Sequence, residues 1–286
     1  MYRKFIQIWN FIRFKRVKLT RRFLRKNNFL LEISKRQKFI ISVIFLSSVL
    51  FLSEYLFGKS GVYIAFLISF LTDIFLFWAV NEDLKDNFSL QIFILPFLFS
   101  LAFGLFYFLI PARFLTRTMT TSLYAIGLYS LLLSQNIFLV SSIRTIALLS
   151  SARTVSFVTT LLAYFFLSNV LFTLHLNIFV TLTVLFILSF PLILQSIWTY
   201  TLDNKLFSQS LWVLCITICL IEIALVLWFW PVIPTIIALF LTGFFYIVVG
   251  LSHVWLERRL FRNVMWEYIW VAVVVFIIFI FFAFRS

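Results

Sequence analysis

The clearest feature of this chain is its hydrophobic pattern: from Phe39 onward, long apolar runs alternate with short polar stretches. A run of about 20 residues, rising 1.5 Å per residue as a helix, crosses a hydrocarbon core of roughly 30 Å. Lipid offers the backbone no hydrogen-bond partners, and the runs lack the alternation of a membrane β-barrel, so they must be helices. The pattern predicts about nine transmembrane helices, within a range of eight to ten: Phe39–Phe57, Gly61–Val80, Leu90–Ile110, Ser122–Val140, Val155–Phe172, Ile178–Trp198, Gln209–Trp230, Val232–Ser252 and Tyr268–Phe284.

The composition agrees with an all-α, polytopic integral membrane helix bundle. The 286 residues are 63% hydrophobic and 12% charged, whereas about a quarter of the residues in soluble domains are charged. The connections between the predicted helices are short, so neighbouring helices should run antiparallel and pack side by side. No segment is left over for a soluble domain.

Residues 1–38 form a basic arm before the predicted transmembrane domain, residues 39–286. The arm holds 13 of the 24 Lys and Arg residues and one acid, Glu32. By the positive-inside rule it lies in the cytoplasm or at the membrane interface, and nine spans then put the C-terminus outside. We therefore expect a multi-pass protein of the plasma (inner) membrane whose first helix is an uncleaved signal anchor. A mitochondrial transit peptide is the weaker alternative, because the arm is poor in serine.

Three acids fall within predicted spans: Glu54, Asp73 and Glu222. A carboxylate inside a membrane is costly and by default suggests a function. No Lys or Arg lies in the interior of a predicted span to pair with these acids. They either hydrogen-bond to neutral side chains on neighbouring helices, which we favour, or form a path for protons or cations.

Cys215, Cys219 and Glu222 share one helix face, because they follow i, i+4, i+7 spacing, and we expect this face to turn toward the bundle. The thiolates of Cys215 and Cys219 make a weak candidate for a metal site. The favoured interpretation is two small buried side chains at a packing face. No other metal site and no cofactor are expected.

The pattern Ser-Ser-x-Arg-Thr occurs twice between Ser141 and Thr154. Hydroxyls and guanidinium groups suit phosphate oxygens, and Ser150 or Ser151 is a candidate cap for the helix that follows. On one continuous helix the two arginines would lie on opposite sides, one facing lipid headgroups and the other the bundle. The simpler interpretation is positive-inside anchoring, and residues 135–155 are alternatively interfacial or re-entrant. Candidates for binding an anionic headgroup or phosphate are Arg144, Arg153, Ser141, Ser142, Ser150, Ser151, Arg258, Arg259 and Arg262.

Sequence motifs for catalysis are lacking: there is no HExxH, GxSxG or CxxC, so no catalytic residue is assigned. Both histidines, His175 and His253, fall at predicted span ends, where a solvated or capping role is expected.

Three functions remain open. The preferred one is a structural or binding component of a membrane assembly, or an anionic-lipid-associated protein; its partners would be the bilayer, anionic headgroups and other membrane proteins, with no nucleic acid. The second is a transporter of protons, cations or lipid-like molecules that uses the three intramembrane acids. The third is a membrane enzyme acting on lipid-linked phosphate. It requires that an acid, one of Glu82, Asp83, Asp86 and Glu257, meets the arginines in a cleft.

Overall fold

The computed structural model describes residues 34–57, 61–84, 89–111, 113–141, 148–202 and 209–283; within these ranges the side chains of 54–57 and 82–84 are not described. The described residues form nine α-helices and no strand: α2 (Lys35–Phe57), α3 (Gly61–Leu84), α4 (Gln91–Leu109), α5 (Phe114–Ser141), α6 (Leu149–Thr173), α7 (Ile178–Thr201), α8 (Ser210–Trp228), α9 (Pro234–Leu256) and α10 (Arg262–Ala283).

All nine of these helices are long and apolar enough to cross a membrane. The described part of the chain is therefore a multi-pass helical membrane protein, which confirms the predicted fold class and the predicted number of spans. Pro96 and Pro191 lie inside α4 and α7, and both helices continue through them.

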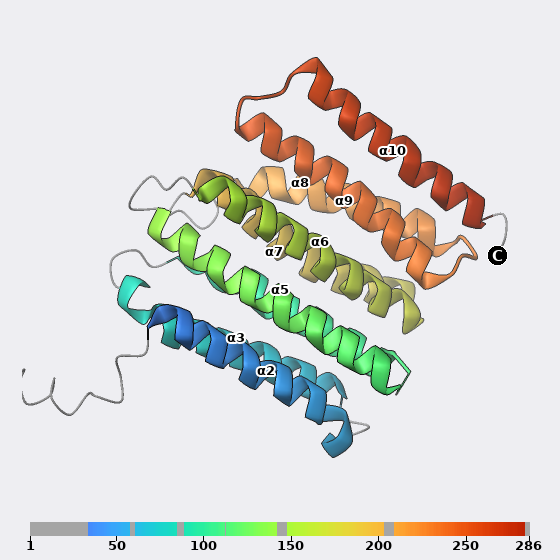
Figure 1. Cartoon of the computed structure of the whole chain (residues 1–286). Helices are drawn as coiled ribbons and strands as arrows, with labels where there is room; N and C mark the ends of the chain where they lie inside the picture. Colours follow the sequence, from blue (N-terminus) through green and yellow to red (C-terminus); the bar gives the residue numbers. More distant parts are fainter. Residues whose placement is uncertain are drawn as a thin grey trace, which may run out of the picture. The chain divides into compact units, whose positions relative to one another are not determined.

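From Phe39 onward the helices lie side by side, with α2 and α3 on one side of the bundle and α10 on the other (Figure 1). The central helix is α6, which packs against α4, α5, α7 and α9. α10 packs against α9, and Phe279 is its one buried residue in the described structure. We call the end at which α6, α8 and α10 begin the Arg153 end, and the opposite end the Trp230 end.

Glycines permit two of the closest helix contacts. A Cβ atom on Gly104 of α4 would lie 2.8 Å from the Cβ of Ala65 in α3. On α9, Gly243 faces Val275 and Gly250 faces Tyr268, both in α10. Small residues let membrane helices approach closely enough for dispersion contacts to hold them together. The docking of α10 therefore depends on two glycines spaced seven residues apart on α9.

Several helices extend beyond the apolar runs that predict them. α5 begins at Phe114 rather than Ser122, so Arg117 lies inside a helix and is 8% exposed. Arg117 lies in the first turn of this helix, outside the predicted span, because hydropathy misses polar helix ends. α5 continues to Ser141 and α6 begins at Leu149, so those parts of 135–155 are helical and 142–147 lie outside the described residues.

Candidate functional site

Arg153 joins three helices at the Arg153 end of the bundle. Its Nη1 donates to Oε1 of Glu257, just after α9, over 3.1 Å. Its Nε and Nη2 donate to the backbone carbonyls of Thr199 (3.1 Å) and Tyr200 (3.3 Å) in the last turn of α7. The final carbonyls of a helix lack intrahelical partners and carry the negative end of the helix dipole, so a guanidinium stabilises them. Arg153 thus caps α7 and pairs with the acid at the end of α9.

His253 lies beside this arginine in a stack of rings. The centroid of the Tyr200 ring lies 4.6 Å from the guanidinium carbon of Arg153, and the same ring stacks on the His253 ring with 4.1 Å between centroids. His253 Nε2 shares a 3.1 Å hydrogen bond with the Ser196 hydroxyl, and the Phe157 ring meets the imidazole edge-on at 4.9 Å. His253 is 4% exposed. The expected solvated or capping role is therefore wrong for His253, because α6 and α7 cover it; His175 is exposed as expected.

An apolar groove runs along α9 and α10, and Trp212 of α8 lines one part of it. Its wider part has a volume of about 420 Å³ and is lined by Trp212, Leu251, Trp255, Leu260 and Tyr268, among others. Its second part, of about 370 Å³, is lined by aromatic residues that include Phe240, Phe244 and Phe276. Ile247 and Ala272 line both parts, so the two hollows adjoin each other. We call this feature the α9 groove.

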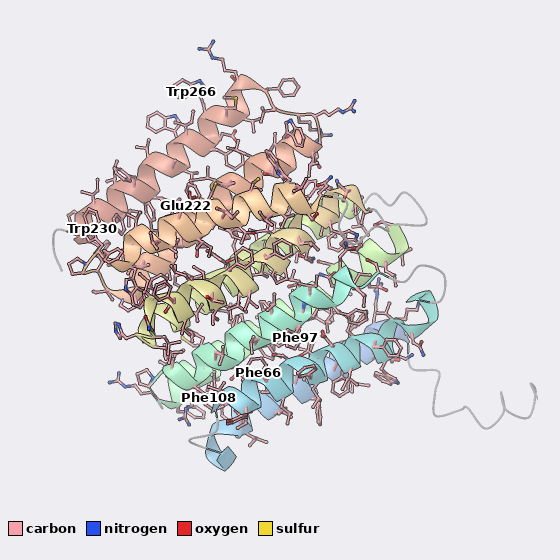
Figure 2. The ribbon with its side chains drawn as sticks, turned by 180° about the vertical axis from the view of Figure 1, so that it is seen from behind. Phe66, Phe97, Phe108, Glu222, Trp230 and Trp266 are labelled. Carbon is pink, nitrogen blue, oxygen red and sulfur yellow. The ribbon has the colours of Figure 1, made fainter. Side chains whose placement is uncertain are left out.

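Three arginines lie close in sequence to Leu260, which lines the α9 groove. Arg258 and Arg259 lie in the connection between α9 and α10, together with the groove residue Leu260, and Arg262 begins α10. All three are exposed, and Arg258 takes a left-handed backbone conformation with φ of 55°. Figure 2 shows nitrogen-tipped side chains around this end of α10, which Trp266 marks. We call Arg258, Arg259 and Arg262 the arginine turn.

The predicted headgroup residues are only partly brought together. Arg153 faces the bundle, and Glu257 lies between it and Arg259, whose Nη1 is 3.9 Å from Glu257 Oε2. Ser150 and Ser151 are exposed in the first turn of α6, and the helix has no side-chain cap, so the expected cap is wrong. The Ser141 hydroxyl donates to the carbonyl of Phe138 in its own helix. Ser142 and Arg144 lie outside the described residues.

The face of α8 that carries Cys215, Cys219 and Glu222 is exposed and turns away from the bundle. Our expectation that it faces the bundle is therefore wrong. The buried face of α8 consists of other residues, which pack against α7 and α9: Val213, Ile216, Thr217, Leu220, Ala224 and Leu227. Within the described residues, no three His, Cys, Asp or Glu side chains meet as potential metal ligands.

The intramembrane acids do not form one described cluster. Asp73 is half-buried on α3, and its Oδ1 is buried without a hydrogen-bond partner among the described residues. Glu222 lies on α8, on the opposite side of the bundle in Figure 1. The Glu54 side chain lies outside the described structure. Next to Asp73, Thr72 joins a buried hydroxyl chain through Ser100 to Tyr124, with oxygen distances of 2.8 and 3.0 Å.

Sequence reasoning missed Tyr200, Ser196 and the buried position of His253. The one local signal was the i, i+4 spacing of His253 and Glu257, which puts both side chains on one side of α9. Their partners on α6 and α7 are distant in the sequence and carry no motif.

A protein family described as "Protein of unknown function (DUF5656)" matches residues 37–282. The match leaves out most of the basic arm and runs from the start of α2 to the end of α10. No curated protein and no solved structure matches the chain.

Proposed function

The chain belongs to the DUF5656 family, and on that premise we propose that it is a multi-pass membrane protein that binds an anionic glycerophospholipid. One acyl chain of the lipid lies in the α9 groove, and its phosphate lies at the arginine turn. By the positive-inside rule, the Arg153 end faces the cytoplasm of an inner membrane.

The observation that carries this proposal is the continuity of the α9 groove with the arginine turn. Leu260 lines the groove and directly follows Arg258 and Arg259 in the sequence. From Trp255 to Phe240 the groove follows α9 over about 22 Å, a length suited to an extended acyl chain. An apolar slot that ends at cationic side chains matches a lipid with an anionic head, since Arg binds phosphate oxygens through paired N–H groups.

Contacts of Glu257 support binding rather than catalysis. Oε1 of Glu257 accepts from Arg153, and Oε2 faces Arg259. Both carboxylate oxygens of Glu257 therefore already face arginine side chains. The enzyme hypothesis required an acid that meets the arginines. Glu257 does meet two of them, and we infer that these contacts hold the arginine turn in position. Glu257 pairs with Arg153 and Arg259, so Arg258 and Arg262 are available to bind a ligand.

Lipid competition tests the proposal. The purified, delipidated protein is incubated with equal amounts of phosphatidylglycerol and phosphatidylcholine that carry identical acyl chains, and bound lipid is counted by native mass spectrometry. We expect a several-fold preference for phosphatidylglycerol. The triple variant Arg258→Gln, Arg259→Gln, Arg262→Gln should lose this preference, whereas Arg113→Gln, an exposed arginine at the Trp230 end, should keep it.

A second variant tests the acyl-chain site separately. Ala272→Trp places a large ring where the two parts of the groove join, so it should lower the retention of both lipids without changing their ratio. Equal retention of the two lipids by the wild type would overturn the proposal. Preferential retention of a polyprenyl phosphate over phosphatidylglycerol would overturn the choice of a glycerophospholipid and favour a lipid-linked phosphate.

A further inference from the structure

A seven-residue repeat runs along the outward face of α8 and ends at Phe229, the residue after the helix. Leu211, Cys215, Ile218, Glu222, Leu225 and Phe229 follow one another at alternating steps of four and three, and all six are exposed. Leu211 and Phe229, near the two ends, are 80% and 75% exposed. Alternating steps of four and three are the a and d positions of a left-handed helix pair. We call these six residues the α8 seam.

Glu222 makes the α8 seam unlike an ordinary lipid-facing surface. Glu222, labelled in Figure 2, is exposed, and no hydrogen bond or ion pair joins its carboxyl to another described residue. From Glu222 to Trp228, the last residue of α8, the helix rises about 9 Å, so the carboxyl lies below the membrane interface. Acids at such depth usually face the protein interior or a polar partner. The carboxyl therefore requires a partner from outside the bundle.

We propose that the α8 seam is the interface between two copies of this chain, which pack α8 against α8 in parallel. Copies of one protein insert in the same orientation, so a two-fold axis along the membrane normal brings identical residues together at the same depth. Two carboxyl groups that share one proton form a hydrogen bond, so a pair of Glu222 side chains at the same depth can bind each other. A polar residue at a single a position fixes the register of such a pair.

The two cysteines occupy different positions relative to this interface. Cys215 is an a residue, seven before Glu222, and would face Cys215 of the second copy. Cys219 is one residue beyond the d position Ile218, at the flank of the seam. A disulfide requires the two Cα atoms to lie within about 7 Å of each other. Two Cys215 residues at facing a positions would meet this requirement, whereas two Cys219 residues at the flank would not. Because these are the only two cysteines in the chain, an added oxidant reports on this geometry without engineered residues.

Oxidative cross-linking in membranes tests the interface. Membranes containing the full-length protein are treated with copper phenanthroline, which removes two electrons and two protons per disulfide, and dimers are quantified on non-reducing gels. Wild type and Cys219→Ser should form a cross-linked dimer, whereas Cys215→Ser should not. A cysteine at Ile187, exposed on α7, introduced into the protein without its two native cysteines, controls for random collision and should not cross-link.

Glu222 is tested by two replacements in the Cys219→Ser protein. Glu222→Gln keeps a group that donates and accepts, so it should retain the cross-link. Glu222→Leu removes the hydrogen bonds and should lower the cross-linked fraction roughly three- to tenfold, the range for an interhelical hydrogen bond in a membrane. Equal cross-linking by Cys215→Ser and Cys219→Ser would overturn the proposed register. A monomer in native mass spectra together with no cross-link, or a complex with another protein through this face, would overturn the dimer itself.

The interface does not depend on the lipid proposal. The arginine triple variant and Ala272→Trp alter the α9 groove and should leave the Cys215 cross-link unchanged. Loss of lipid preference with an intact cross-link would show that the two sites are separate, so either proposal can fail alone.

Discussion

Nη1 of Arg153 and Oε1 of Glu257 lie 3.1 Å apart although the two residues are 104 positions apart in the chain. Glu257 follows the C-terminus of α9, where a negative charge is disfavoured by the helix dipole, and Arg153 compensates for it. The same guanidinium caps α7, so one side chain ties the ends of three helices together.

Arg153→Lys should destabilise the protein although it conserves the charge. A lysine can reach Glu257, but a single ammonium cannot also donate to the Thr199 and Tyr200 carbonyls and lie flat on the Tyr200 ring. We expect a loss of about 1 to 2 kcal/mol, seen as a melting temperature lower by several degrees in detergent. Arg113→Lys is the matched control and should leave the melting temperature unchanged. An unchanged value for Arg153→Lys would mean that the cap on α7 contributes nothing.

Tyr124→Phe should weaken the contact between α4 and α5. The Tyr124 hydroxyl is buried and shares a hydrogen bond with Ser100, which in turn bonds Thr72. Removal of one partner of a buried hydrogen bond costs about 1 kcal/mol. Tyr129→Phe is the control, since its hydroxyl makes no hydrogen bond to a described residue. Equal melting temperatures for the two variants would contradict the importance of the hydroxyl chain.

Gly250→Leu should displace α10. A Cβ at this position would lie 2.6 Å from Cε1 and 2.9 Å from the hydroxyl oxygen of Tyr268. Because α10 packs against α9, the clash should move the whole helix rather than be absorbed by the core. We expect faster hydrogen exchange in α10 with little change elsewhere, and weaker retention of phosphatidylglycerol. The double variant Gly250→Leu, Tyr268→Ala restores the space and should reverse both effects; failure to do so would place the cause outside this contact.

Labelling of single cysteines tests the proposed orientation. In a protein lacking Cys215 and Cys219, a membrane-impermeant maleimide added to intact cells should label a cysteine at His175, at the Trp230 end. It should label a cysteine at Arg259 only after the cells are broken, because the proposed orientation puts the Arg153 end in the cytoplasm. Both positions are exposed, so accessibility within the protein is matched. The reverse pattern would invert the topology and move the arginine turn to the outer leaflet.

The positions of the helices follow from the sequence because the bilayer itself imposes them. Each run long enough to span the membrane must satisfy its own backbone, so length and hydropathy are sufficient, and all nine predicted spans are found. Helix ends are less predictable, since residues such as Arg117 in α5 are polar yet helical.

The sequence does not determine in the same way which side of each helix faces the bundle. In a membrane, apolar residues suit both the lipid and the helix interface, so hydropathy does not distinguish the side of α8 with Glu222 from the side with Leu220. The burial of His253 depends on Tyr200 and Phe157, which come from other helices. Arg153 was a candidate for its charge, but its partners could be identified only from the fold.

Because α10 is attached to the bundle along α9, the thickness of the bilayer helps to determine the tilt of α10. A helix enclosed by neighbours keeps its angle when the membrane changes, whereas one docked along a single side adjusts its angle to the hydrocarbon thickness. α10 spans Arg262–Ala283, about 33 Å of helix, and its lipid-facing side is held by nothing in the described protein. Thinner membranes should therefore tilt α10 more, and the width of the groove beside it should vary with membrane thickness.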